Sequence, residues 1–279
     1  MFVIAGLGAA LAYGIAMVLQ QRGARTVPGE VSLRAGLVIQ LLRRRLWLIG
    51  VACNLAAFGL RGLALSDGSL AVVQPVILLG LFVALTIEAR LDRRAFGPGE
   101  ALGSLALIGG LLLFVLAAAP GRGRPDALAV DWLALGAVVG GAALLAVVRA
   151  SRLTGEARAA GLALGGALLL ALVSALTKAA AGQGTDVLRS WELYALLAVG
   201  AVAVVVTQSA FQAGPLRASL PVLSVVEPLT SILVGAWVFE EHLGTSVVAR
   251  AGEASGLLLL GLGTLLLTTR PAAVRVPAR

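Results

Sequence analysis

Two tetrapeptides of the same pattern contain the residues with the clearest capacity for chemistry. Val-Val-Gln-Pro at 72–75 recurs 153 positions later as Val-Val-Glu-Pro at 225–228, and both lie in apolar runs. The amide of Gln74 is thereby matched with the carboxyl group of Glu227. An ionised carboxylate in hydrocarbon costs at least ~2.5 kcal/mol, so Glu227 must face the protein interior, be paired or be protonated. This position predicts a group that handles an ion or takes up and releases a proton.

The depth of Glu227 and the two prolines give this motif a mechanical meaning. Glu227 lies roughly 14 Å, or about nine residues, from one end of its expected helix, near the middle of the membrane. Pro75 and Pro228 each remove a backbone donor and displace a carbonyl one turn earlier, which predicts a kink in each helix. Both features also have structural explanations, since a protonated Glu227 can join two helices and membrane helices tolerate proline.

Other polar residues in apolar runs extend the candidate site. Lys178 is the single lysine beside 21 arginines, and its amine can act as a movable charge or, near a helix end, reach the membrane interface. Arg61 and Asp67 lie near one helix end and are expected to form a structural pair. Asn54 offers an amide to a cargo or to a neighbouring helix. The candidate binding residues are Glu227, Gln74, Lys178 and Asn54, and the candidate kink residues are Pro75 and Pro228.

Membrane-spanning helices are the elements that must position these residues. Hydrophobic residues make up 59% of the 279 residues, charged residues only 13%, and the mean hydropathy is +0.98. Apolar runs of about 18 to 23 residues, enough to cross ~30 Å of hydrocarbon, predict an all-α polytopic membrane protein with about nine spans. We place them near 2–20, 46–65, 69–90, 100–119, 131–148, 159–181, 191–211, 218–239 and 252–269. The segment 22–45 is expected to hold a short interfacial helix, with a tenth span as the alternative.

The basic residues predict the orientation of these spans. Sixteen of the 22 Lys and Arg residues fall on alternate loops, which the positive-inside rule assigns to the cytoplasm. This layout predicts a multi-pass protein of the plasma membrane with the N-terminus outside and the C-terminus in the cytoplasm. It also places Trp47, Trp132, Trp191 and Trp237 near span ends, where anchoring at the membrane interface is the expected role.

Matched positions at one spacing indicate a duplicated architecture. At an offset of 153, Gln74 aligns with Glu227, Pro75 with Pro228 and Glu88 with Glu241. An odd number of spans separates the two motifs, so we expect two inverted repeats, as in many secondary transporters. We assign 1–120 to the first membrane repeat, 121–158 to a connecting segment with one linker helix, 159–270 to the second repeat and 271–279 to a cytoplasmic tail.

The second half resembles the EamA-type repeat of the drug/metabolite transporter superfamily. The similarity lies in the Pro-containing helix at 219–235 and in the element Phe-Glu-Glu-His-Leu at 239–243. The first half is similar to the magnesium-transporter (NIPA-like) branch through Gln-Gln-Arg-Gly at 20–23 and Asn-Leu-Ala-Ala-Phe at 54–58, although Cys53 replaces the acidic residue of that branch. The resemblance implies a permease fold without naming the cargo.

We therefore expect a permease that moves a small solute or metabolite by alternating access, with proton coupling as an option. The alternatives are a divalent-cation pathway of the magnesium type and a non-transporting membrane assembly protein. Cys53 and His242 are the only residues of their types, so we expect no enzyme, no Cys/His metal site and no cofactor. Arginines confined to short loops argue against a nucleic-acid partner. The expected partners are the bilayer, a small-molecule or ion substrate and, as an option, a second copy in a homodimer. Gly-x-x-x-Gly spacings such as 252–256 permit close helix packing either within one chain or between two copies.

Overall fold

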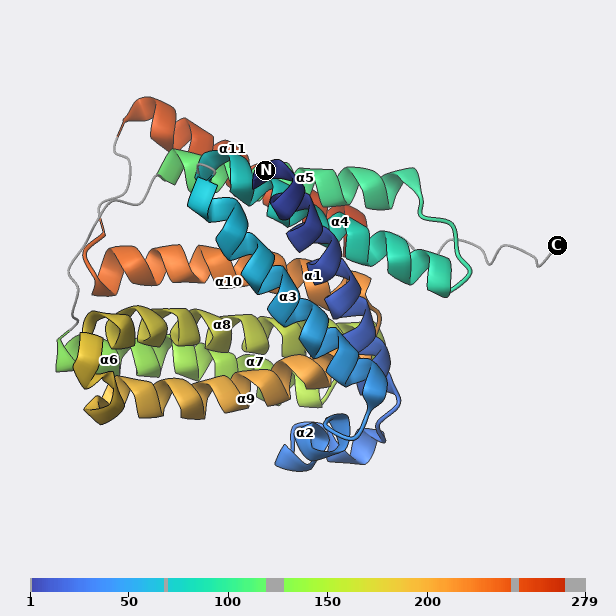
Figure 1. Ribbon diagram of the computed structural model, residues 1–279, viewed down its shortest axis with the longest axis horizontal. Helices are drawn as coiled ribbons and strands as arrows, with labels where there is room; N and C mark the ends of the chain where they lie inside the picture. Colours follow the sequence, from blue (N-terminus) through green and yellow to red (C-terminus); the bar gives the residue numbers. More distant parts are fainter. Residues whose placement is uncertain (1, 68–69, 119–127, 242–245, 269–279) are drawn as a thin grey trace.

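The computed structural model describes residues 2–67, 70–118, 128–241 and 246–268, and every regular element in these ranges is helical. In Figure 1 the helices α7 to α10 run nearly side by side, while α1 and α3 cross them obliquely. In chain order the elements are α1 (Phe2–Arg25), η1 (Gly29–Val31), α2 (Ala35–Leu41), α3 (Arg45–Asp67), α4 (Leu70–Leu91), α5 (Pro98–Ala118), α6 (Ala129–Leu135), η2 (Gly136–Gly140), α7 (Gly141–Ser151), α8 (Gly155–Gly182), η3 (Gly184–Arg189), α9 (Trp191–Ala213), α10 (Leu216–Val238) and α11 (Val247–Thr268).

Seven helical runs within the described residues are long and apolar enough to cross a membrane. They are α1, α5, the continuous run α6–η2–α7, α8, α9, α10 and α11. The helices α3 and α4 add lengths of 23 and 22 residues. Helix α2 has only seven residues, about 10 Å, which is too short to cross ~30 Å of hydrocarbon. The apolar runs fold as helices because lipid offers no partner for backbone groups. The chain is thus an all-helical multi-pass membrane protein.

Large apolar side chains cover the outside of the bundle. On α11, Leu257, Leu258, Leu262 and Leu265 are exposed, whereas Leu260 is buried in the core. A monomer in water rarely exposes such a continuous apolar surface. Acyl chains are as apolar as leucine, so this surface is matched to a bilayer.

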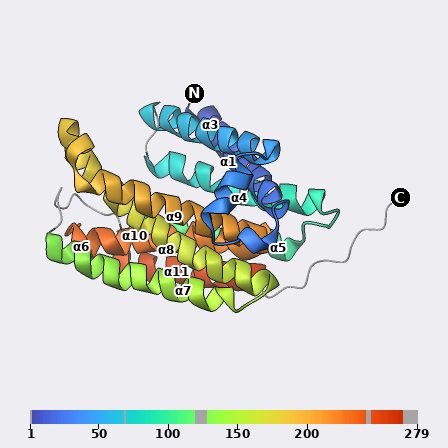
Figure 2. The ribbon, with the colours of Figure 1, turned by 90° about the horizontal axis from the view of Figure 1, so that it is seen from below.

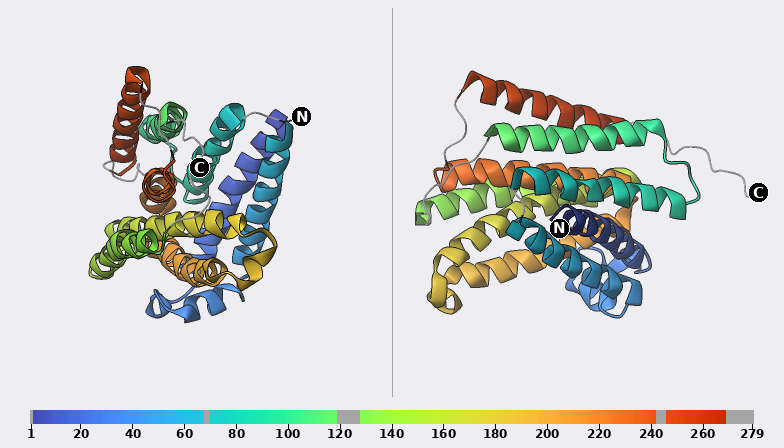
Figure 3. Two further views of the ribbon diagram at one scale, coloured as in Figure 1. Left: turned by 90° about the vertical axis from the view of Figure 1, so that its left-hand side faces the viewer. Right: turned by 45° about the horizontal axis from the view of Figure 1, so that its top comes forward.

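Three sets of helix contacts organise the bundle. Helix α1 packs against α3 and α4, α8 packs against α9 and α10, and α5 and α11 lie side by side (Figure 3). The expected first repeat, 1–120, contains α1 to α5. The expected second repeat, 159–270, contains α9 to α11 and all of α8 except its first turn, which begins at Gly155. The expected connecting segment, 121–158, holds the α6–η2–α7 run, which packs on α8. Residues 119–127 and the expected tail, 271–279, lie outside the described residues.

Glycines let α5 and α11 approach each other closely. A Cβ added at Gly110 would lie 2.8 Å from the carbonyl oxygen of Gly256, and one added at Gly256 would lie 2.8 Å from that of Gly110. A Cβ at Gly263 would lie 2.7 Å from the carbonyl oxygen of Gly103. Small residues at such positions allow backbone-to-backbone packing of membrane helices. The spacing at 252–256 therefore serves packing within this chain.

Amide side chains tie the helices together at one end of the bundle, which we call the α2 end. Gln208 of α9 accepts a hydrogen bond from the indole of Trp47 at 3.0 Å and donates one to Gln20 of α1 at 3.0 Å. Trp47 is only 7% exposed, so the expectation that it anchors the chain at the membrane interface is wrong, because this buried bond holds it inside. Figure 2 shows α2 in front of the ends of α1 and α9. We call the opposite end, where α6 begins and α8 ends, the α6 end.

Candidate functional site

The carboxyl group of Glu227 lies midway along α10. It belongs to the twelfth of the 23 residues of this helix, so about 17 Å of helix separates it from either end. Pro221 and Pro228 both lie inside the continuous helix. The side chains at 224–232 are all partly exposed, whereas most of those nearer the two ends are buried. The middle of α10 is thus the part that its neighbours enclose least tightly.

Charged and polar groups from the first half of the chain lie within electrostatic reach of Glu227. Arg61 of α3 interacts electrostatically with Glu227, and Tyr13 of α1 lies within reach of both charges. Gly80 of α4 makes room for the Tyr13 ring, since a Cβ at position 80 would lie 2.8 Å from its Cδ1 atom. The fold therefore brings together residues of α1, α3 and α10 that are far apart in the sequence.

Sequence reasoning misses two members of this group, Tyr13 and Ser231. Ser231 lies four residues after Glu227, and this spacing places both on one helix face, so the pattern could have revealed it. Its hydroxyl is buried and has no hydrogen-bond partner within the described part of the chain. No sequence pattern marks Tyr13. The expected pair of Arg61 with Asp67 falls on a side chain outside the described residues, that of Asp67. The charge of Arg61 does reach Glu227.

The other expected site residues are distributed over the fold. Gln74 and Pro75 belong to α4, but their side chains lie outside the described residues. Asn54 is exposed on α3 and lies seven residues, or about 10 Å, before Arg61. Lys178 lies near the end of α8 and belongs to a separate group at the α6 end. Of the expected binding residues, only Glu227 is observed in the central group.

Lys178 forms an ion pair at the α6 end. Its ammonium group lies 2.5 Å from Oε1 of Glu241 and 4.1 Å from the centre of the Phe239 ring, which combines a salt bridge with a cation–π contact. Trp132 packs edge-on against Phe239, with ring centres 6.2 Å apart. Gly235 leaves room for the carboxylate of Glu241, because an added Cβ would collide with it. The Phe-Glu-Glu element after α10 thus supplies the partner of Lys178.

Glu88 binds the first turn of α10 at the α2 end. Its side chain is fully buried, and Oε1 accepts a hydrogen bond from the backbone N–H of Leu216 at 2.6 Å. Arg94 lies 3.5 Å from Oε2 of Glu88 and 2.5 Å from Oε1 of Glu100. A carboxylate at a helix N-terminus satisfies a free N–H group and interacts favourably with the helix dipole. The aligned residues Glu88 and Glu241 therefore have different partners.

Two further ion pairs lie at the α2 end. Arg217, in the first turn of α10, pairs with Glu156 in the first turn of α8. Arg22, in the last turn of α1, pairs with Asp92 directly after α4. Like the pair at Lys178, both are partly exposed.

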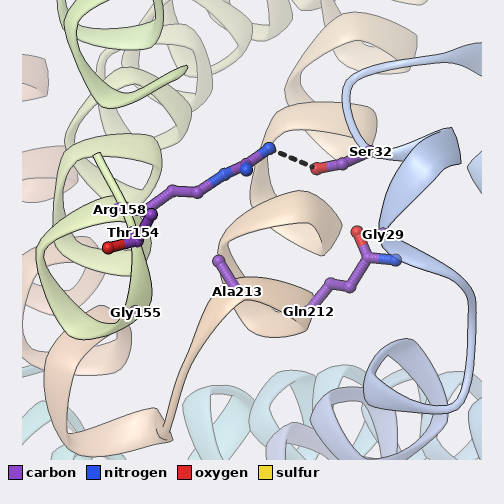
Figure 4. Close-up of a pocket in the computed structure, with 7 residues that line it drawn as sticks. All are labelled: Gly29, Ser32, Thr154, Gly155, Arg158, Gln212 and Ala213. Atoms are coloured by element: carbon purple, nitrogen blue, oxygen red, sulfur yellow. Dashed lines mark hydrogen bonds between the residues drawn. The ribbon is translucent and has the colours of Figure 1, made fainter. Parts of the chain in front are cut away.

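A pocket of about 170 Å³ opens at the α2 end, away from Glu227. Figure 4 shows Arg158 reaching across this pocket toward Ser32. Arg158 donates to the hydroxyl of Ser32 at 3.3 Å, and Gln212 donates to two backbone carbonyls just before η1. These polar groups therefore link η1 to α8 and α9. A second void, beside Ser224 in α10, measures only about 10 Å³, which is no more than the space for one water molecule.

The central group can bind charge and exchange a proton. The carboxyl group of Glu227 accepts hydrogen bonds when ionised and can also donate one when protonated. The guanidinium of Arg61 pairs with anionic groups, and the phenol of Tyr13 both donates and accepts hydrogen bonds. Within the described ranges, no group of three or more His, Cys, Asp and Glu side chains is gathered as a metal site would require. The groups of Glu227, Arg61 and Tyr13 are thus able to bind a charged solute or to exchange a proton.

Comparison with known proteins places the chain in a family. No family model matches it. No solved structure matches it either. It is 30% identical over 267 residues to the uncharacterized protein Cgl0250/cg0304 of Corynebacterium glutamicum, and the alignment covers 92% of this chain and 90% of that protein. The chain therefore belongs to the same family as this corynebacterial protein, along nearly its whole length.

Proposed function

We propose that this chain is a permease that moves a small solute or metabolite across the plasma membrane by alternating access, with proton coupling at Glu227. The position of this carboxyl group carries the proposal, because it lies midway along α10 and within electrostatic reach of Arg61 and Tyr13 from the first half. Binding sites of secondary transporters lie near the membrane midplane between two halves. An ionisable group in the middle of a membrane helix is costly and marks a solute or proton pathway.

Helix packing and ion pairs support two inverted repeats. Helix α1 packs with α3 and α4 as α8 packs with α9 and α10. The pair of Arg22 on α1 with Asp92 after α4 corresponds to the pair of Lys178 on α8 with Glu241 after α10. Counting α3 and α4 as spans beside the seven others gives nine. Nine spans place these two ion pairs at opposite membrane surfaces, as inversion requires.

The charge distribution supports the orientation of the permease. The arginines concentrate in the loops at the α2 end, which we assign to the cytoplasm by the positive-inside rule. The α6 end then faces outward. The resemblance of 219–243 to the EamA-type repeat agrees with a permease of the drug/metabolite transporter type.

A magnesium pathway receives less support from the site. A hard divalent cation requires several oxygen ligands around one point. Glu227 instead lies within electrostatic reach of the guanidinium of Arg61, which repels a cation and attracts an anionic group.

Flux through purified protein tests the proposal. Sealed vesicles containing the protein are screened with amino acids, nucleosides, polyamines, monovalent cations and divalent metals, with a pH gradient imposed or absent. We expect gradient-dependent uptake of one solute class, lost in Glu227→Gln and retained in Glu30→Gln, which removes an exposed carboxyl group in η1 at the α2 end. Undiminished gradient-dependent uptake in Glu227→Gln would show that this residue does not couple transport to protons.

Cysteine labelling tests the orientation separately. In a Cys53→Ser background, a cysteine at position 2 is expected to react with an impermeant reagent applied outside the cell. Reaction only from the cytoplasm would overturn the proposed orientation.

A further inference from the structure

Ion pairs join α10 to α8 near both ends of the two helices. At the α2 end, Arg217 in the first turn of α10 pairs with Glu156 in the first turn of α8. At the α6 end, Glu241 just after α10 pairs with Lys178 near the end of α8. The two helices therefore run in the same direction and are held together at both ends, about 34 Å apart along the 23 residues of α10.

Both ion pairs are suited to break and re-form. At the α6 end, the side chain of Lys178 is 36% exposed and that of Glu241 is 20% exposed. At the α2 end, the side chain of Glu156 is 51% exposed and that of Arg217 is 13% exposed. Partly exposed ion pairs shift an equilibrium by only roughly two- to fivefold. The ammonium of Lys178 keeps an alternative partner, the Phe239 ring at 4.1 Å, and Glu156 keeps access to water. Neither pair is a permanent clamp.

The region between the two ion pairs is the part of α10 most able to bend. Pro221 and Pro228 lie inside the helix, and each removes one backbone hydrogen bond. Glu227 lies ten residues, or about 15 Å, after Arg217 and eleven residues, or about 17 Å, before the end of α10 at Val238. Beyond that end the chain turns back, and the N–H of Glu241 bonds to the carbonyl oxygen of Gly235. The side chains around it, at 224–232, are partly exposed. Bending at this point would change the distance of either end of α10 from α8.

We propose that the Lys178–Glu241 and Glu156–Arg217 ion pairs are the outer and inner latches of α10, and that they open in turn to expose the site around Glu227 to one side of the membrane at a time. This inference rests on the proposed function, because alternating access is the motion that requires two latches. Both ion pairs are formed in the structure, so both latches are closed in the state observed, and either one can open from it.

Side-specific labelling of one cysteine tests the latches without any cargo. The reporter is Ser231→Cys in a Cys53→Ser background, since the hydroxyl of Ser231 is buried one turn from Glu227. An impermeant thiol reagent is applied to right-side-out and to inside-out vesicles. We expect Glu241→Gln to raise the labelling rate from the outside roughly two- to fivefold, and Glu156→Gln to raise it from the cytoplasmic side by a similar factor. The charge-swapped double variant Lys178→Glu with Glu241→Lys should restore the original rate.

Matched controls separate latch opening from general loosening. Arg189→Gln and Arg152→Gln each remove an exposed charge near one end of the bundle outside the two ion pairs, and should leave both rates unchanged. Unchanged labelling in both latch variants, or labelling raised from both sides by either one, would overturn the latch proposal. Side-specific labelling without flux of any solute would reject transport and keep the latches. Solute flux together with unaltered labelling in the latch variants would support transport and reject the latches.

Discussion

Replacing Glu88 is expected to weaken the connection between the two halves of the chain at the α2 end. Its fully buried carboxylate accepts the backbone N–H of Leu216 at 2.6 Å. A hydrogen bond to a charged group contributes roughly 1.5–3 kcal/mol, and an unpaired buried N–H costs about 1–3 kcal/mol. Arg94 keeps its contact with Glu100 at 2.5 Å, which limits the further loss. We therefore expect Glu88→Ala to lower the free energy of unfolding by about 2–4 kcal/mol, and Glu88→Gln, which keeps a neutral acceptor, by about 1–2 kcal/mol.

Equilibrium unfolding in mixed micelles of sodium dodecyl sulfate and a non-ionic detergent measures these differences. The matched control is Asp92→Asn, which removes a carboxylate from a partly exposed ion pair just four residues later. This control should lower the free energy of unfolding by less than about 1 kcal/mol. If Glu88→Ala and Asp92→Asn cost the same small amount, the role assigned to Glu88 at the start of α10 is wrong.

The same unfolding assay checks three more predictions. Gly110→Val, where an added Cβ would meet the α11 backbone at 2.8 Å, should lower the free energy of unfolding by about 1–3 kcal/mol. The control Gly109→Val, with no atom within 4 Å of an added Cβ, should change it little. Equal losses in the two variants would contradict the close packing of α5 and α11. Arg93→Gly should raise the free energy of unfolding by about 0.5–1 kcal/mol, because Arg93 follows the end of α4 with a φ of 53°, which glycine adopts without strain. Arg90→Gly, in the last turn of α4, should instead lower it by about 1 kcal/mol. The opposite order would show that the positive φ is not strained. Gln208→Leu leaves a buried indole and a second glutamine unpaired and should cost about 2–4 kcal/mol, and a loss near zero would refute this network.

The length and hydropathy of the apolar runs are sufficient to predict the helices. A segment in lipid must satisfy its own backbone groups, so an apolar run of sufficient length has few conformations other than a helix. The same reasoning explains why the short apolar stretch before Arg43 forms only the seven-residue α2. Glu227 is also recognisable as a candidate site residue, because its motif repeats and its depth in the membrane follows from counting residues.

The neighbours of Glu227 are much harder to predict. Ser231 follows from helical spacing, but Tyr13 comes from α1 and has no signal of its own, and the spacing of Arg61 to Asp67 does not indicate that the charge of Arg61 also reaches Glu227. Trp47 shows the same limit, since its position near a span end suggests the membrane interface while a hydrogen bond from α3 to α9 holds it in the core. Each case depends on which helix faces which, and that information is not contained in one helix.

By itself, the sequence determines that this chain crosses a membrane repeatedly as helices and that one of two matched motifs carries a carboxyl group. Only the tertiary structure decides which polar groups meet. Lys178 pairs with Glu241, 63 residues away, and Glu88 binds Leu216, 128 residues away. The physical reason is that helix formation depends on hydropathy and on backbone bonds within about one turn, both of which are local. Contacts between helices depend on where glycines and small side chains let two backbones approach, and that is decided by the packing of the whole bundle.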